Sequence, residues 1–206
     1  MNDLESAIPN EPPAQASELK VLQDEYPQVV EKYMPQDLKD SPKPVYAVDV
    51  GCGFALATKA ITDFVGENIH YRGIDTKPLM GAKAWNEDLK GQVVFENADA
   101  TQREPLGENN DLIIIRNPDV FGSIQHVLSS GGITNEWKKI LLNSLESLRT
   151  GGYLFLTTHA KNELEAILEF LPKDKTKEII PLGLIDPSLQ SKYQIREVVI
   201  ALLQKV

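Results

Sequence analysis

Residues 45–55 read VYAVDVGCGFA, and this stretch predicts a strand, a tight glycine turn and the start of a helix. The apolar run 45–48 is typical of a buried strand, and Asp49, Gly51 and Gly53 follow it. Glycine is favoured where the backbone turns sharply and a ligand approaches it closely. A carboxylate before the turn disfavours a pyrophosphate, which prefers backbone amides without an acid beside them. The stretch therefore predicts a site for a nucleotide cofactor with cationic or hydroxyl groups.

From Val45 onward the chain alternates apolar strands with helices. Apolar strands separated by helices predict a parallel sheet covered on both faces. The last two strands have only a loop between them, which suits an antiparallel pair. The fold class expected is α/β, with a seven-stranded, mostly parallel sheet and an antiparallel C-terminal strand pair. Strands are expected at 45–50, 70–74, 92–96, 111–116, 152–158, 177–181 and 194–203, and helices at 54–65, 78–89, 135–149 and 162–171.

The helix at 135–149 has the clearest boundaries. Thr134 or Asn135 can accept a hydrogen bond from its first turn, and Gly151 is expected to end it.

The chain before the first predicted strand is expected to be an extension, 1–44, of one domain at 45–206. Residues 1–16 are polar and proline-rich, a composition that predicts no ordered structure. Residues 17–33 can form a helix with an apolar face, interrupted at Pro27. Such a face needs a surface to pack on.

Composition limits the functions to consider. The formal net charge of −9 disfavours nucleic acid as a substrate, because an acidic protein does not attract a polyanion. The sequence has no run of about 18 apolar residues, so no membrane span is expected. No secretory signal is apparent, and the lone Cys52 allows no intrachain disulfide, so a cytoplasmic location is expected. Cys52 is interpreted as a small side chain in a tight turn, and no cluster has the spacing of metal ligands.

From residue 45 onward, the ordered motifs resemble class I S-adenosylmethionine-dependent methyltransferases. Residues 49–55 resemble the acidic-x-Gly-x-Gly-x-Gly motif of that family, with Ala55 at the third glycine. Asp75 resembles the acid that holds the ribose hydroxyls, and Asp99 the acid that accepts from the adenine amino group. Residues 148–154 resemble the Gly-Gly turn before the fifth strand. The resemblance implies a Rossmann-like fold and S-adenosylmethionine as cofactor.

A nicotinamide dinucleotide is the competing cofactor, but its fingerprint needs a glycine where Leu56 stands. The residues expected to bind S-adenosylmethionine are Asp49, Gly51, Cys52, Gly53, Asp75, Thr76, Asp99, Ala100 and Asn117.

The methyl acceptor is expected beside the exit of the fourth strand. Residues 117–121 (NPDVF) resemble the Asn-Pro-Pro-aromatic motif of amino-group methyltransferases, with Asp119 at the second proline. Asn117, Asp119 and His159 are the candidate catalytic residues, with Asp119 or His159 as the base. Arg116 could meet an acidic group of the substrate or pair with a nearby carboxylate.

Together these features predict a methyltransferase that acts on a nitrogen or oxygen atom of a small molecule. The alternative is a cofactor-binding protein or partner subunit that keeps the fold without catalysis. The polar residues at the expected acceptor site favour the enzyme. We expect a monomer or a homodimer with no membrane partner.

Overall fold

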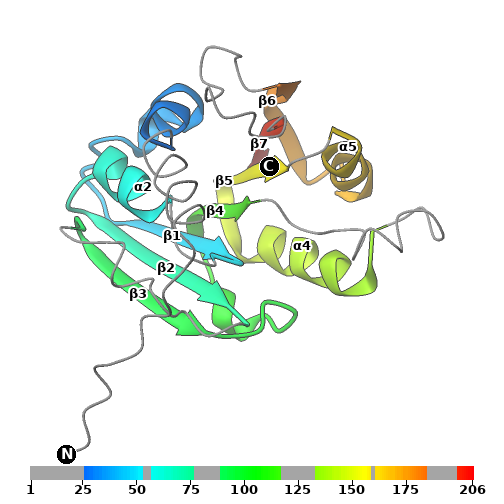
Figure 1. Cartoon of the computed structure of the whole chain (residues 1–206), viewed down its shortest axis with the longest axis horizontal. Coiled ribbons are helices and arrows are strands. Elements are labelled where there is room, and N and C mark those ends of the chain that lie inside the picture. Colours follow the sequence, from blue (N-terminus) through cyan, green and yellow to red (C-terminus); the bar gives the residue numbers. More distant parts are fainter. Residues whose placement is uncertain (1–25, 53–56, 77–88, 117–132, 159–160, 185–198) are drawn as a thin grey trace, which may run out of the picture.

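The computed structural model describes residues 26–52, 57–76, 89–116, 133–158, 161–184 and 199–206. Within these residues a seven-stranded sheet has the order β3-β2-β1-β4-β5-β7-β6 (Figure 1). The strands are β1 Val45–Val50, β2 Ile69–Asp75, β3 Gln92–Asn97, β4 Asn110–Arg116, β5 Leu148–Thr158, β6 Thr176–Leu184 and β7 Val199–Lys205. The helices are α2 Thr58–Val65, α4 Asn135–Ser147 and α5 Lys161–Phe170, with short 3₁₀ turns η1 Gln36–Leu38 and η2 Glu104–Leu106.

The strand directions confirm the predicted fold class. β1 lies parallel to both β2 and β4, β2 is parallel to β3, and β4 is parallel to β5. Only β7 runs the other way, antiparallel to β5 and β6. Residues 112–115 of β4 are all fully buried, as expected for a central strand with helices on both faces.

Two apolar clusters cover the two faces of the sheet. Side chains alternate along β1, so Val45 and Ala47 join one cluster while Val48 and Val50 join the other. The first cluster includes α2 and residues 26–38, of which 26–33 are helical; the second includes α4 and α5. Figure 1 shows helix 26–33 in blue beside α2, with α4 and α5 across the sheet.

The end of α4 differs from the prediction. The helix stops at Ser147, because Leu148 is extended and pairs with Asn110 of β4. Gly151, expected to end the helix, instead lies inside β5 with φ 80°, near a shift in the β4–β5 register. Strand pairing therefore ends this helix at Ser147, four positions before the glycine expected to end it.

Several predicted elements fall partly or wholly outside the described residues. The predicted helix at 78–89 is in this group, as are residues 17–25 of the first helix and 194–198 of the last strand. In the described part of the chain, no helix has the length and apolar character needed to cross a membrane.

Candidate functional site

The glycine turn leaves β1 at the carboxyl edge of the sheet. Gly51 has φ 69°, a conformation that side chains with a Cβ rarely adopt. The amides of Gly51 and Cys52 both donate to the carbonyl of Ile74, at 2.8 and 3.1 Å. A Cβ at Gly51 would meet no atom within 4 Å, so the backbone conformation, not crowding, requires glycine here. The turn is thus held against the end of β2, one residue before Asp75.

The acids predicted to bind the cofactor follow the ends of neighbouring strands. Asp75 is the last residue of β2 and is half-buried, and Thr76 after it is exposed. Asp99 comes two residues after β3 and is also exposed. Because β1, β2 and β3 are adjacent and parallel, their carboxyl ends meet at one edge of the sheet. Asp75 and Asp99 therefore share that edge with Gly51.

The Asp99 carboxylate already closes a local turn. Its two oxygens accept from the amide and the hydroxyl of Thr101, each at 2.8 Å. The next residue, Ala100, is buried against the cluster under α4. These contacts fix the segment after β3 and direct Asp99 toward solvent.

Asn143 is a contributor to this edge that the sequence-based prediction missed. Its side-chain amide, on α4, donates to the carbonyls of Ala100 and Thr101 at 3.2 and 2.9 Å. One α4 side chain thereby holds the loop that carries Asp99. The sequence offers only a weak signal, a polar residue flanked by the apolar stripe of α4.

Asp49 has a different environment from the other two acids. Its side chain is completely buried on the face covered by α2. Its Oδ2 accepts from the hydroxyl of Tyr71 at 2.7 Å and from Nη2 of Arg116 at 2.9 Å. Thr58 donates in turn to the Tyr71 hydroxyl at 3.1 Å. Oδ1 of Asp49 has no hydrogen-bond partner within the described ranges.

Arg116, the last residue of β4, adopts one of the two roles considered for it: it pairs with a carboxylate. Besides Asp49, it donates to the carbonyl of Cys52 at 3.2 Å and to the phenol oxygen of Tyr26 at 3.3 Å. Its guanidinium also lies 5.3 Å from the centre of the Tyr26 ring. Burial opposes the charged form, but attraction from Asp49 outweighs it, and the pKa of Arg116 is raised well above its usual value.

Burial and the nearby carboxylates make Cys52 a poor nucleophile. Its side chain is buried, and burial first, then Asp49 and Asp75, raise the pKa of its thiol to about 12. The thiol therefore stays protonated at neutral pH.

Other predicted site residues lie outside the described residues. They are Gly53, Asn117, Asp119 and His159. Among the residues that the structure does describe, no group of three or more His, Cys, Asp and Glu side chains could hold a metal ion.

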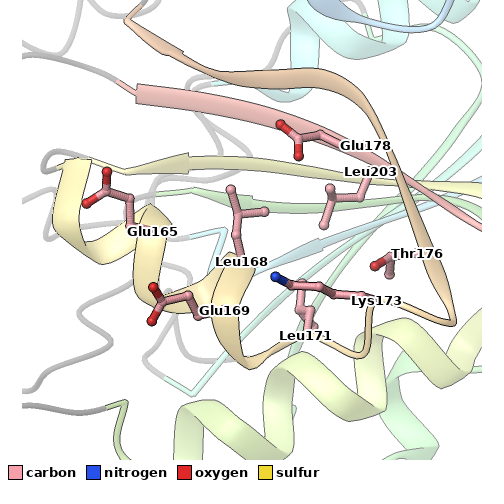
Figure 2. Close-up of a pocket in the computed structure, with 8 residues that line it drawn as sticks. All are labelled: Glu165, Leu168, Glu169, Leu171, Lys173, Thr176, Glu178 and Leu203. Carbon is pink, nitrogen blue, oxygen red and sulfur yellow. The ribbon is translucent and has the colours of Figure 1, made fainter.

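A hollow of about 450 Å³ lies elsewhere, between α5 and the strands β6 and β7 (Figure 2). Leu168, Leu171 and Leu203 supply its apolar surface, and Lys173 reaches across it in the close-up. Its charged side chains are all exposed. β4, β5 and β7 separate the edge strand β6 from β1. This hollow is therefore distinct from the edge that carries the glycine turn.

The strand order, the reversed last strand and the glycine turn between β1 and α2 together define a known architecture. It is the Rossmann-like fold of class I S-adenosylmethionine-dependent methyltransferases, shared by many solved structures.

Three of these structures illustrate the likeness. TrmN from Thermus thermophilus has 16% identity and a TM-score of 0.60 over 87% of this chain, which spans 48% of the TrmN chain. An rRNA methylase from Streptococcus thermophilus has 14% identity and a TM-score of 0.55, over 98% of this chain and 99% of its own. The N-methyltransferase NodS from Bradyrhizobium japonicum WM9, in complex with S-adenosyl-L-homocysteine, has 14% identity and a TM-score of 0.54, over 95% of this chain and 89% of its own.

No protein-family model matches the chain, and no curated protein matches it in sequence. At the identities found, the likeness concerns the fold.

Proposed function

We propose that this chain is an enzyme that binds S-adenosylmethionine and transfers its methyl group to a nitrogen or oxygen atom of a small molecule. The observation that carries the proposal is the glycine turn. It has Gly51 at φ 69°, and two of its amides are tied to the strand that ends in Asp75. That NodS, a neighbour in fold, is solved with S-adenosyl-L-homocysteine supports the choice of cofactor.

The residues at the edge suit the parts of this cofactor. A carboxylate can accept from two vicinal hydroxyls, so we expect Asp75 to hold the ribose. Asp99 and Ala100 follow the neighbouring strand, where we expect the adenine. Asp49 keeps Oδ1 free of partners among the described residues, so this carboxylate retains an acceptor for a donor group of the cofactor. Gly51, Cys52, Gly53 and Thr76 would line the same edge.

The cofactor, when bound, supplies a methyl group on a positively charged sulfur. The protein's task is to align the acceptor's lone pair with the methyl carbon and to exclude water. As the new bond forms, the carbon–sulfur bond breaks and the acceptor loses a proton. We expect Asn117 to orient the acceptor, and Asp119 or His159 to take that proton.

A small molecule is the favoured acceptor. The comparison structures include an rRNA methylase, so RNA is the competing class of methyl acceptor. The formal net charge of −9 argues against a phosphate backbone as ligand. A cytoplasmic location and a monomeric or homodimeric state complete the proposal; sedimentation would check the oligomeric state.

Asp75→Ala tests the cofactor site. Hydrogen bonds to a charged group are worth about 1.5–3 kcal/mol, so calorimetry should show S-adenosylmethionine binding about 10- to 150-fold weaker. Asp63→Ala is the matched control, because Asp63 is an exposed aspartate on α2 that pairs with Lys59 on the same helix. No binding by the unmodified protein at millimolar cofactor would end the proposal.

Asn117→Ala and Asp119→Ala test the acceptor site. Both should lower turnover far more than cofactor affinity, because the contacts form with the acceptor and the transition state. Turnover is followed as S-adenosylhomocysteine released in a screen of small amines, acids, phenols and RNA. Asp174→Ala, at an exposed position after α5, is the control. Cofactor binding without turnover on any acceptor would favour the catalytically silent alternative.

A further inference from the structure

Arg116 joins three segments that are far apart in the sequence. It lies at the end of β4 and contacts the Asp49 carboxylate of β1, the Cys52 carbonyl of the glycine turn and Tyr26 of helix 26–33. The contacts with Asp49 and Tyr26 span 67 and 90 positions along the chain. A single side chain therefore connects the N-terminal helix to the turn.

The contacts fit a planar guanidinium and no other cation. Nη2 serves both Asp49 and the Cys52 carbonyl, while Nη1 reaches Tyr26, and the ring of Tyr26 lies beside the guanidinium. A lysine has one nitrogen at the end of a flexible stem and cannot hold three such partners in fixed directions. Burial strengthens the arrangement, because the side chain of Arg116 is 9% exposed and that of Asp49 is 0% exposed.

The arrangement also sets the orientation of the acid. Arg116 and Tyr71 both bind Oδ2 of Asp49, so the carboxylate cannot rotate freely and its other oxygen has a defined direction. The bond to the Cys52 carbonyl restrains the peptide next to Gly53. The fixed Asp49 carboxylate and the restrained Cys52 peptide both act on the turn from the face of the sheet that α2 covers.

We propose that Arg116 is a positioning residue that holds the glycine turn in its ligand-ready conformation and couples it to helix 26–33 through Tyr26. The effect on cofactor affinity rests on the proposed function, whereas the coupling between helix and turn does not. An ion pair that served stability alone would leave Tyr26 without influence on the turn.

Amide hydrogen exchange of the unliganded full-length protein tests the coupling. Tyr26→Phe removes one hydroxyl from helix 26–33, and Arg116→Met removes the guanidinium while keeping most of the side-chain volume. Both should speed exchange at the Gly51 and Cys52 amides, by about 2- to 10-fold for the loss of one hydrogen bond in Tyr26→Phe and more for Arg116→Met. Amides of α4 serve as the internal reference, and Arg103→Met, which breaks exposed ion pairs with Glu108 and Glu146, is the matched control.

Calorimetry with S-adenosylhomocysteine tests the effect on the ligand. Affinity should fall about 2- to 10-fold in Tyr26→Phe and further in Arg116→Met, with Arg116→Lys between the unmodified protein and Arg116→Met. We expect partial rescue by lysine because its positive charge still pairs with Asp49. It lacks the planar arrangement of several N–H donors that arginine provides.

Exchange at Gly51 and Cys52 that does not change, or that rises equally in α4, would overturn the positioning role. The positioning role would also be overturned if Arg116→Met and Arg116→Lys both bound S-adenosylhomocysteine as tightly as the unmodified protein does. If the unmodified protein binds no S-adenosylhomocysteine, the proposed function fails, and the exchange experiment still decides the coupling. If Arg116→Met does not fold, Tyr26→Phe and Arg116→Lys decide both points.

Discussion

At residue 52 the glycine turn carries a thiol that is 2% exposed and that feels the negative charges of two carboxylates. Burial and the charges of Asp49 and Asp75 both disfavour the thiolate, and they raise the pKa of Cys52 from 9.0 to about 12. The contribution of this group to stability is fully present below pH 9. It is lost as the pH rises from 9 toward 12, because the unfolded chain ionises first.

We expect the thiol of Cys52 to resist a disulfide reagent at pH 8 in the native protein and to react rapidly in denaturant. The measurement is the rate at which the reagent's thiolate is released by reaction with Cys52, with and without denaturant. Cys52→Ala is the companion variant: its free energy of unfolding should fall less steeply than that of the unmodified protein between pH 9 and 10.5, as followed by urea denaturation. Rapid labelling of the native protein would show that the thiol is accessible.

Gly73 of β2 lies behind the same turn. A Cβ there would lie 2.6 and 2.9 Å from Cδ1 and Cε1 of Phe95 and 3.0 Å from Sγ of Cys52. The glycine thus makes room for an aromatic side chain on β3 and for the thiol of the turn.

Gly73→Ala should destabilise the protein by about 1–3 kcal/mol, the range for an overpacked site. Urea denaturation measures the change. Phe95→Ala should relieve part of the cost when combined with Gly73→Ala, because it removes the ring that supplies the two closest atoms. A fully additive double variant would contradict the packing explanation.

At the scale of the element, α4 does more than cover the sheet. Thr134 caps it by accepting from the amide of Trp137, which selects one of the two caps expected from the sequence. Leu141 and Leu145, in its apolar stripe, are buried. Asn143 binds the loop after β3. The position of Asp99 thus depends on a helix that comes later in the chain.

Asn143→Ala should lower the free energy of unfolding by about 1–2 kcal/mol, because two hydrogen bonds to backbone carbonyls are lost. If Asp99 and Ala100 bind the adenine, S-adenosylhomocysteine affinity should fall as well. Chemical denaturation and calorimetry provide the two measurements, and Lys139→Ala, at an exposed position on the same helix, is the control. Stability equal to that of the control would show that α4 does not hold the loop.

At the scale of the whole molecule, residues 26–38 are part of the core. Val29, Val30, Met34 and Leu38 are at most 8% exposed and join the cluster that contains α2. The hydroxyl of Tyr153 on β5 also donates to Asp37, at 3.0 Å. The segment before β1 therefore contributes to the same hydrophobic core as the sheet.

Deleting residues 1–40 should prevent stable folding. Each large aliphatic side chain that is fully buried contributes about 1.5–3 kcal/mol, so losing four approaches the whole stability of a domain, about 5–15 kcal/mol. Deleting residues 1–16 alone should leave the melting temperature unchanged. Thermal unfolding of both truncated proteins checks this expectation. A stable 41–206 protein would show that the sheet buries its α2 face without the N-terminal segment.

The sequence by itself determined the order along the chain of the described strands and helices, the antiparallel last pair and the place of the glycine turn. Local patterns in the sequence predict these features: the spacing of apolar residues and the glycines that follow a strand. Asp75 and Asp99 could be placed at one edge for the same reason, since each follows its own strand.

Only the tertiary structure decided what the buried polar groups do. Arg116 pairs with Asp49, which lies 67 positions away in the sequence, and this contact decides that it does not serve as a free substrate-binding cation. Asn143 holds the loop after β3 through contacts that span about 40 positions. The end of α4 at Ser147 was decided in the same way, by pairing of Leu148 with Asn110. Local periodicity carries no information on such partners, because a hydrogen bond forms only after the strands and helices have packed.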